Sequence, residues 1–354
     1  MSMPPKTSGR LIEFGLWLSL WAIVSGCSSL PTQELSFSGP SIEGVRNFHL
    51  VTPSNPDPQP IFDRVQGLGP VLQWSPDGET VLVEIETGQY HVADPDSGQV
   101  GNCISCAIPD ARTVYYSPDG EFFAIGANSG LYLVDSVGGE PAQLADIARP
   151  GWIDWSPDGS KMLFSSGVST AGSRRFDIYL YDLETNQLTN LTAGEGTERA
   201  DFFSPRWSPD GTEIAFHSMD EDGFHLMLAQ ADGSDMVVLT DWFFRGEAFL
   251  PETAPPPQWS PNGKRLAYQA YDEINANLSQ DIFVVDADGS NRKNLTRSPG
   301  FDSNPQWSSN GRWIAFVSSR DGNGEIYVMA PDGGNVTNVS NMPVTDELIP
   351  FWRP

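Results

Sequence analysis

Short apolar runs alternate with polar, turn-forming clusters along most of this 354-residue chain. Residues 81–83, 123–125 and 314–316 are apolar at every position, with clusters of Gly, Asp or Asn before and after them. A second set of apolar runs follows, for example residues 131–134 and 282–285. Runs of this length between turn signals predict buried β-strands. The pattern therefore predicts an all-β protein.

One motif, an aromatic residue followed by Ser-Pro-Asp-Gly or a close variant, precedes the first apolar run six times. Pro and Asp suit the two central positions of a type I turn, and Gly suits the left-handed position after them. Each motif therefore predicts a tight hairpin, with its aromatic side chain packed between neighbouring sheets. The aromatic residues are Trp74, Tyr116, Trp155, Trp207, Trp259 and Trp307, and a truncated seventh copy contains Trp352.

The motif aromatics are separated by 42, 39, 52, 52, 48 and 45 residues. A period in the forties with strand-like content predicts a β-propeller of four-stranded blades. Trp352 would lie on the inner strand of a seventh blade, whose outer strands are expected from the N-terminal residues 45–51 and 61–65. We predict seven blades, closed by N- and C-terminal strands, with six blades as the alternative. Residues 45–354 would form one domain.

Residues 1–26 have the features of a secretory signal. Lys6 and Arg10 precede an apolar run over residues 14–24, which is shorter than the roughly 20 residues of a membrane-spanning helix. The run ends in Val-Ser-Gly-Cys, which resembles the bacterial lipobox and implies cleavage before a lipidated Cys27. An ordinary signal peptide or a retained membrane helix is the alternative. Residues 27–44 would then be a flexible tether to a bacterial membrane, in the periplasm or on the cell surface.

The two remaining cysteines, Cys103 and Cys106, form a CxxC sequence. No second cysteine pair is present to complete a zinc site. Export to an oxidising compartment favours a small local disulfide. A redox function is the less favoured interpretation.

The repeats resemble the TolB-type β-propeller repeat, and the resemblance covers about residues 68–354. The α/β domain that precedes the propeller in TolB itself has no counterpart here, and TolB is not lipidated. The resemblance therefore implies the fold, and the partners of that family are not transferred to this chain.

The chain carries 46 Asp and Glu against 20 Lys and Arg, a net charge of −26. A nucleic-acid binder needs a basic surface that displaces counterions from phosphates, so we exclude that class. The acidic balance favours basic partners or divalent cations.

Sequence signatures of catalysis are absent: no GxSxG, HExxH, phosphate-binding or dinucleotide-binding motif occurs. Some propeller lyases of the oligogalacturonate type resemble this repeat and hold a metal through several His. Here His217 and His225 are expected to be neighbours across a hairpin, without a third partner. We therefore predict no catalytic site, no metal and no cofactor.

Three connections that lead into inner strands are rich in aromatic residues and Arg, which are enriched at binding hot spots. They are expected to gather on one rim of the propeller, although packing onto the blades is an equal alternative. The residues of this predicted rim are Phe202, Phe203, Arg206, Trp242, Phe243, Phe244, Arg245 and Phe301.

These features together predict a membrane-anchored, non-catalytic, monomeric module that binds a protein or an envelope polymer through one rim. The alternative is a carbohydrate-active propeller, either a glycan-binding protein or a metal-dependent polysaccharide lyase, that uses the central channel. Five of the residues that precede the motif aromatics are polar, without a catalytic pattern: Gln73, Asp154, Arg206, Gln258 and Gln306.

Overall fold

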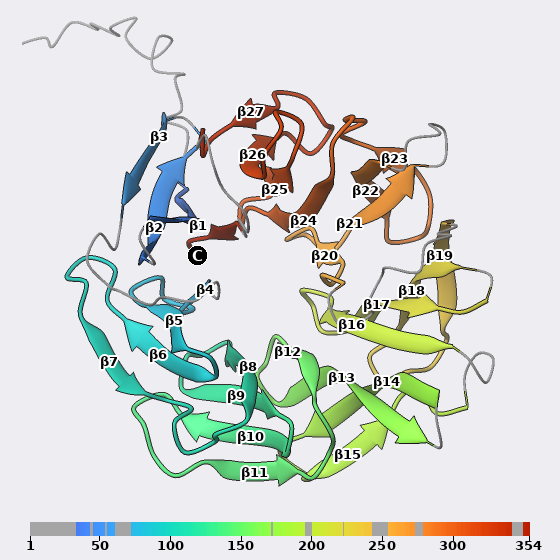
Figure 1. Ribbon diagram of the computed structural model, residues 1–354. Helices are drawn as coiled ribbons and strands as arrows, with labels where there is room; N and C mark the ends of the chain where they lie inside the picture. The colour runs from blue at the N-terminus through green and yellow to red at the C-terminus, as the bar shows by residue number, and fades with distance from the viewer. Residues whose placement is uncertain are drawn as a thin grey trace, which may run out of the picture. The chain divides into compact units, whose positions relative to one another are not determined.

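The computed structural model describes residues 33–42, 45–53, 55–60, 72–170, 173–194, 200–221, 223–242, 254–272, 279–341 and 350–354. Within these ranges every regular element is a β-strand, and the strands form seven four-stranded sheets arranged in a ring (Figure 1). The predicted seven-bladed β-propeller is confirmed. No helix in this part of the chain has the length and apolar character needed to cross a membrane.

Six blades consist of four consecutive strands each, from β4–β7 to β24–β27, and the seventh combines β28 with β1, β2 and β3. The strands are β1 (Leu35–Ile42), β2 (Val45–Thr52), β3 (Asn55–Pro60), β4 (Leu72–Trp74), β5 (Val81–Glu86), β6 (Gln89–Ala93), β7 (Val100–Cys103), β8 (Ala111–Tyr116), β9 (Phe122–Ala127), β10 (Gly130–Asp135), β11 (Ala142–Ala145), β12 (Gly151–Trp155), β13 (Lys161–Thr170), β14 (Ser173–Asp182), β15 (Gln187–Asn190), β16 (Asp201–Trp207), β17 (Glu213–Met219), β18 (Phe224–Gln230), β19 (Val237–Trp242), β20 (Gln258–Trp259), β21 (Arg265–Asp272), β22 (Ser279–Asp286), β23 (Lys293–Asn294), β24 (Asp302–Trp307), β25 (Ile314–Ser318), β26 (Glu325–Met329), β27 (Thr337–Asn338) and β28 (Phe351–Trp352).

The motif turn joins the innermost strand of a blade to its second strand. In the blade β12–β15, the Gly159 N–H donates to Ser156 O (2.8 Å), and the Ser156 hydroxyl donates to Asp158 Oδ1 (2.6 Å). The Lys161 N–H in turn donates to Ser156 Oγ (2.9 Å), which fixes the first residue of β13. Gly159 has a φ of 71°, a left-handed conformation that glycine adopts without steric cost. The motif therefore encodes a rigid hairpin.

The hydrophobic core lies between the blades, in several separate clusters. Trp207, for example, packs with Leu163 and Ile178 of the preceding blade and with Phe216 of its own blade. Six of the seven motif aromatics are buried, and Trp352 is half-buried. The aromatic position of the motif therefore joins each blade to its neighbour, as the sequence predicts.

The N- and C-terminal strands close the ring without a covalent bond. β28 pairs with β1, with Leu35 opposite Trp352. The Arg353 guanidinium donates to Glu34 Oε2 (2.7 Å) and to Gly78 O (2.8 Å), and it lies over the Trp74 ring at 4.9 Å. One C-terminal side chain therefore contacts both the N-terminal strand segment and the next blade.

The start of the propeller corrects the predicted tether over residues 27–44. Residues 35–42 form β1, and Leu35 is buried against Val51 of β2 and Val328 of β26. The Ser36 hydroxyl accepts from Trp74 Nε1 (2.8 Å) and donates to Phe351 O (3.2 Å), so β1 belongs to the closing blade. Cys27, the predicted signal over residues 1–26 and the predicted strand over 61–65 lie outside the described residues.

Candidate functional site

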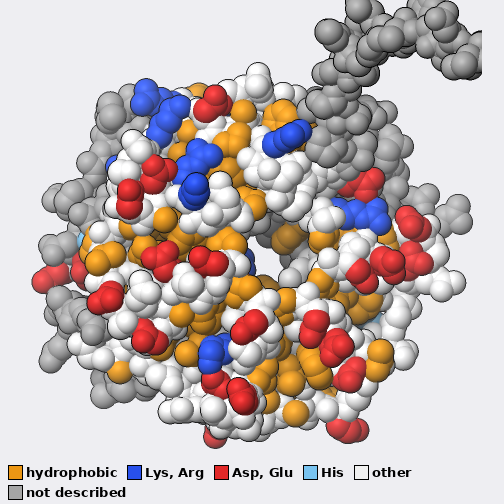
Figure 2. Space-filling view, turned by 180° about the vertical axis from the view of Figure 1, so that it is seen from behind, with side chains coloured by type: hydrophobic (Ala, Val, Ile, Leu, Met, Phe, Trp, Pro, Cys, Tyr) orange, Lys and Arg blue, Asp and Glu red, His pale blue; other side chains and the backbone are white. Residues whose placement is uncertain are grey.

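A cavity of about 580 Å³ lies at the centre of the ring and is lined by the inner strand of every blade. Successive side chains of a strand point to opposite sides, so burying the motif aromatic turns the residue before it toward the cavity. Figure 2 shows the opening on one face, where hydrophobic side chains border the hole. The seven residues that precede the motif aromatics all line the cavity: Gln73, Tyr115, Asp154, Arg206, Gln258, Gln306 and Phe351.

The charged groups of the cavity wall include one ion pair between neighbouring blades. Arg206 Nη1 donates to Asp154 Oδ1 (2.7 Å), and the Trp207 N–H donates to Asp154 Oδ2 (2.7 Å). In the same way the Tyr116 N–H donates to Gln73 Oε1 (3.1 Å). These side chains therefore join adjacent inner strands. Because Asp154 is the one carboxylate among the described wall residues, the wall is much less acidic than the chain as a whole.

Aromatic side chains complete the wall. Burial raises the pKa of the Tyr115 hydroxyl to about 12, with Arg206 lowering and Asp154 raising it to a smaller extent, so this group stays protonated at neutral pH. Trp152 lies at a β-bulge in β12 and has a φ of 49°, which is rare for a bulky residue. Asn304 occupies the matching bulge of β24, with a φ of 53°, and it also lines the cavity. The bulges therefore aim two further side chains at the central space.

The predicted rim does not form one surface among the described residues. Phe202 and Phe203 are only 3% and 1% exposed, so they pack in the core, which is the alternative interpretation. Arg206 is also removed from the rim, because it faces the central cavity. Phe301 is 57% exposed. The side chain of Trp242 and the whole of Phe243, Phe244 and Arg245 lie outside the described part of the structure.

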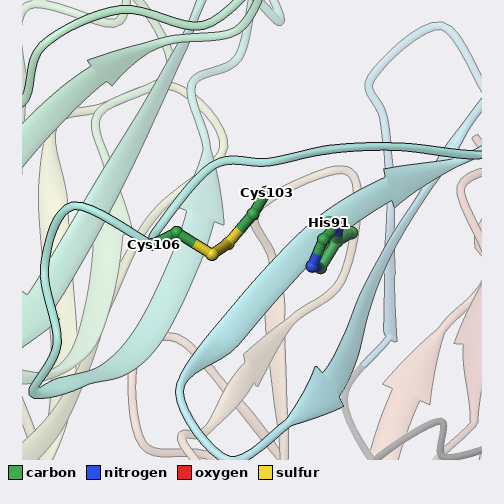
Figure 3. A group of neighbouring side chains, drawn as sticks. All are labelled: His91, Cys103 and Cys106. Atoms are coloured by element: carbon green, nitrogen blue, oxygen red, sulfur yellow. A yellow bond between two sulfur atoms is a disulfide. The ribbon is translucent and has the colours of Figure 1, made fainter.

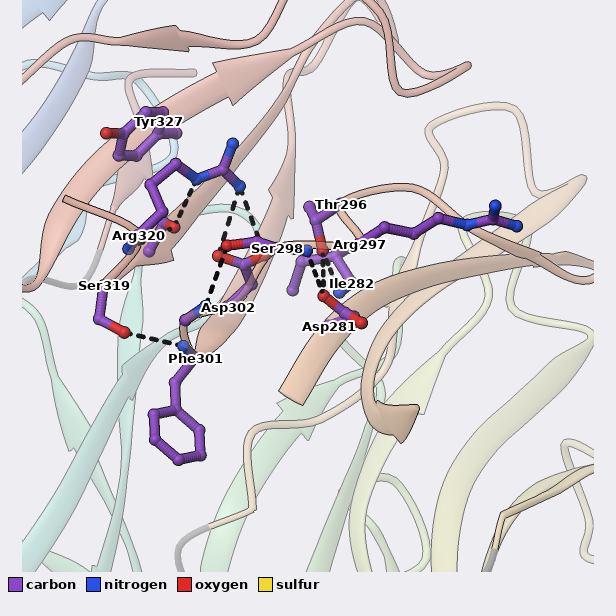
Figure 4. A network of polar contacts seen from close by, with 12 residues as sticks. Asp281, Ile282, Thr296, Arg297, Ser298, Phe301, Asp302, Ser319, Arg320 and Tyr327 are labelled. Atoms are coloured by element: carbon purple, nitrogen blue, oxygen red, sulfur yellow. Dashed lines mark hydrogen bonds and ion pairs between the residues drawn. The ribbon is translucent and has the colours of Figure 1, made fainter. Parts of the chain in front are cut away.

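The last strand of each blade is connected to the inner strand of the next blade, and we call the face with these connections the connector face. Phe301 lies on this face, in the connection formed by residues 295–301. Hydrogen bonds anchor this connection at both ends (Figure 4). The Ser298 N–H donates to Asp281 Oδ1 (3.1 Å), and the Phe301 N–H donates to Ser319 Oγ (2.8 Å). The exposed phenyl ring therefore projects from a fixed backbone.

Arg297 belongs to the same connection as Phe301, with its side chain extended away from the phenyl ring (Figure 4), and Arg320 pairs with Asp302, the next residue. Arg297 is exposed and has a φ of 43°, and its N–H donates to Asn294 Oδ1 (3.2 Å). Arg320 forms an ion pair with the buried Asp302 (3.3 Å), whose pKa is raised by burial. Arg297 is absent from the predicted rim, because a residue after Asn-Leu-Thr carries no signal of exposure in the sequence.

The predicted cysteine pair is joined in the structure. Cys103 and Cys106 form a disulfide, with their Cα atoms 5.6 Å apart. His91 lies next to it on β6 (Figure 3). This group lies at one blade, away from the central cavity, and the cavity wall contains none of its three residues.

Sequence comparison decides the family. Tol-Pal system protein TolB of Bordetella parapertussis is 32% identical over 315 residues, which cover 76% of this chain and 69% of that protein. The chain belongs to the TolB-type β-propeller family. An uncharacterised protein of Agrobacterium fabrum is 30% identical over 259 residues, or 69% of this chain and 82% of the relative.

Two family models match parts of this TolB-type chain. The TolB beta propeller domain matches residues 247–348, and the N-terminal region of dipeptidyl peptidase IV matches residues 156–277. Among solved structures, TolB from Acinetobacter baumannii has a TM-score of 0.53 at 19% identity, covering 91% of this chain and 67% of that chain. Oligogalacturonate lyase in complex with manganese has a TM-score of 0.61 at 16% identity, covering 88% and 85%. At such identities the structural likeness shows the fold alone.

The lyase likeness raises the question of whether this TolB-type propeller offers metal ligands in its cavity. The described wall contains one carboxylate, Asp154, whose two oxygens already accept hydrogen bonds, and it contains no His. His217 is 3% exposed beside the Phe203 ring, and burial lowers its pKa to about 4. His225 contacts Asp220 (3.1 Å). The described residues therefore do not fit a metal-dependent lyase centre.

Proposed function

We propose that this TolB-type propeller is a non-catalytic binding module of the bacterial cell envelope that holds a protein or an envelope polymer on its connector face. The observation that carries the proposal is Phe301, a large exposed apolar side chain on an anchored connection that also carries the exposed Arg297. Aromatic residues and Arg contribute most to binding when they project from a rigid surface. The names of the Tol-Pal relatives support a role in the envelope.

The sequence motif at Cys27 supports a further part of the proposal. A lipid on Cys27 would hold the propeller at a membrane outside the cytoplasm, as a monomer. In that arrangement the acidic character of the chain, whose net charge is −26 over all 354 residues, favours a basic partner segment and disfavours direct contact of the propeller with anionic surfaces.

The proposal predicts that Phe301→Ala and Arg297→Ala weaken partner capture without changing thermal stability. The full-length protein, purified in detergent, would capture partners from solubilised envelopes of its own host. Because truncation of a hot spot removes at least about 2 kcal/mol of binding free energy, we expect a loss of tenfold or more for Phe301→Ala. Quantitative mass spectrometry of the captured material measures it.

The matched control is Val137→Ala, which changes an apolar residue that is 90% exposed in the turn between β10 and β11. It should capture partners as the wild type does. Equal capture by Phe301→Ala and Val137→Ala would contradict the connector-face proposal. Capture that survives both but is lost in Arg206→Ala would instead favour the alternative, a ligand such as a glycan in the central cavity, whose wall combines aromatic and amide groups.

A further inference from the structure

A polar clamp ties the fourth strand to the third strand in three blades of the propeller. In each of these blades an Asn at the end of the fourth strand donates a hydrogen bond to a buried carboxylate. The carboxylate belongs to the residue directly before the apolar run of the third strand. In the blade β20–β23, Asn294 Nδ2 donates to Asp281 Oδ2 (2.9 Å), and the Thr296 hydroxyl donates to Asp281 Oδ1 (3.1 Å). The three carboxylate–amide pairs are Asp177 with Asn190, Asp281 with Asn294, and Glu325 with Asn338.

The blade β4–β7 has the same backbone arrangement with different side chains. The Ile104 N–H donates to Tyr90 O (2.8 Å), as the Leu295 N–H donates to Ile282 O (2.8 Å). The Tyr90 N–H donates to Ser105 Oγ (2.8 Å), which is the role of Thr296 in the other blade. By this alignment Cys103 takes the place of the clamp Asn.

The carboxylate of the clamp is also replaced. Gln89 stands directly before Tyr90, as Asp281 stands before Ile282, and it lies 3.9 Å from Cys106 Sγ. This corner therefore has no carboxylate–amide clamp, and a disulfide between Cys103 and Cys106 holds the chain in its place.

His91 is positioned beside the two sulfur atoms. It pairs with Cys103 across the strands β6 and β7, and residues directly opposite each other place their side chains on the same face. Its Nδ1 lies 3.0 Å from Gly101 O, which can only accept a hydrogen bond, so Nε2 is the ring nitrogen left for a ligand. A ring nitrogen of His91 and both sulfur atoms lie within 4.8 Å of one another (Figure 3).

We propose that reduction of the Cys103–Cys106 disulfide opens a site for Zn²⁺, with two thiolates and His91 as ligands and water as the fourth. A reductant with two thiols would exchange with this disulfide. Its two thiols would lose two electrons and join as a disulfide, and Cys103 and Cys106 would be left as thiols. Zn²⁺ binding would then release one proton from each thiol. The inference goes beyond the proposed binding function and does not depend on it.

The local geometry suits this ligand set. Zn–S bonds of about 2.3 Å in a tetrahedral site require sulfur atoms roughly 3.8 Å apart, so they must separate from the disulfide position. Cys106 is exposed and Cys103 is half-buried, so rotation of these side chains meets little packing. Gly101 O, which holds Nδ1–H, supplies the second contact that orients a metal-binding imidazole. Thiolate and imidazole ligands together favour Zn²⁺ over Ca²⁺ or Mg²⁺.

The test measures Zn²⁺ binding by the full-length protein, with the disulfide intact and after anaerobic reduction by a phosphine. Competition with a chromophoric chelator gives the affinity, and Co²⁺ gives a thiolate-to-metal charge-transfer band. We expect one Zn²⁺ per reduced chain at this site and none with the disulfide intact. Cys106→Ser should abolish the charge-transfer band, and His91→Ala should weaken Zn²⁺ binding at least tenfold.

His225→Ala is the matched control, because it removes a histidine of another blade that contacts Asp220. It should bind Zn²⁺ as the wild type does. Equal melting temperatures of wild type and His91→Ala with the disulfide intact verify that the variant folds. The proposal is overturned if reduction adds no Zn²⁺, if the disulfide form binds it equally, or if His91→Ala binds as tightly as the wild type.

Discussion

Two adjacent residues on each inner strand have different environments. The motif aromatic packs between blades, although Trp155, Trp207 and Trp259 also reach the cavity wall, and the residue before it faces the central cavity. The aromatic position varies little, since only a large apolar side chain fills the space between two blades. The preceding position ranges from Asp154 and Arg206 to Phe351, because a cavity wall sets no packing requirement of its own.

A second feature at this scale is the buried histidine. Burial lowers the pKa of His217 to about 4, and it lowers the pKa of His49 to about 4 as well. Between pH 6.5 and about pH 4 the unfolded chain therefore binds protons that the folded chain does not. The free energy of unfolding must then fall as the pH falls through this window.

We predict that His217→Gln reduces this pH dependence. Each such histidine contributes at most about 1.4 kcal/mol per pH unit to the slope of the unfolding free energy against pH. The variant should lose the contribution of one histidine to that slope. Urea unfolding at several pH values between 4 and 7 measures the slope, and NMR titration of the His217 ring gives its pKa directly. Identical slopes for wild type and variant would contradict the assignment.

At the scale of elements, the motif turn determines where each inner hairpin begins. Its Gly has φ values between 67° and 74° in all six complete copies. The Ser hydroxyl and the carboxylate or amide after it complete the turn, so the sequence alone predicts these hairpins.

Gly159→Ala should destabilise the propeller, because a Cβ is unfavourable at a φ of 71°. We expect a loss of about 1 to 2 kcal/mol in the free energy of unfolding. Gly139→Ala is the matched control, since Gly139 is exposed and a Cβ there would meet no atom within 4 Å. Chemical denaturation compares the two, and an equal effect of both substitutions would contradict the argument.

The sequence revealed neither β1 nor β3 of the closing blade, and β1 shows why. Its residues include Ser36, Ser38, Gly39 and Pro40, which is the composition of a linker. A register shift between Ser38 and Ser41 accommodates the Gly-Pro pair. The segment becomes a strand because it pairs with β2 and β28, and its partner in β28 is more than 300 residues away.

For the whole molecule, the closing contacts of Arg353 hold the first and last strands together. Arg353→Ala removes its hydrogen bond to Gly78 O, its ion pair with Glu34 and its position over the Trp74 ring. We expect the free energy of unfolding to fall by about 1 to 2 kcal/mol and the melting temperature to fall with it. Differential scanning calorimetry measures the change.

Arg312→Ala is the control for this prediction. Arg312 is exposed, and its side chain forms no ion pair within the described part of the chain. Its removal should change the free energy of unfolding by no more than about 0.5 kcal/mol. If Arg353→Ala is equally neutral, pairing of β28 with β1 closes the ring without help from this side chain.

The sequence by itself determined the inner hairpins, the strands of the six complete repeats and the seven-bladed ring, since the turn motif and the apolar runs depend on local chemistry repeated at a regular period. The truncated motif copy at Trp352 also predicted that N- and C-terminal strands form the closing blade together. Only the tertiary structure decided that Phe202 and Phe203 are core residues, that Arg206 pairs with Asp154, and that Cys103 replaces a clamp Asn. Those outcomes depend on contacts between blades and on which side of a strand a residue faces. A single sequence pattern does not fix such contacts, because a β-bulge of one residue reverses the facing.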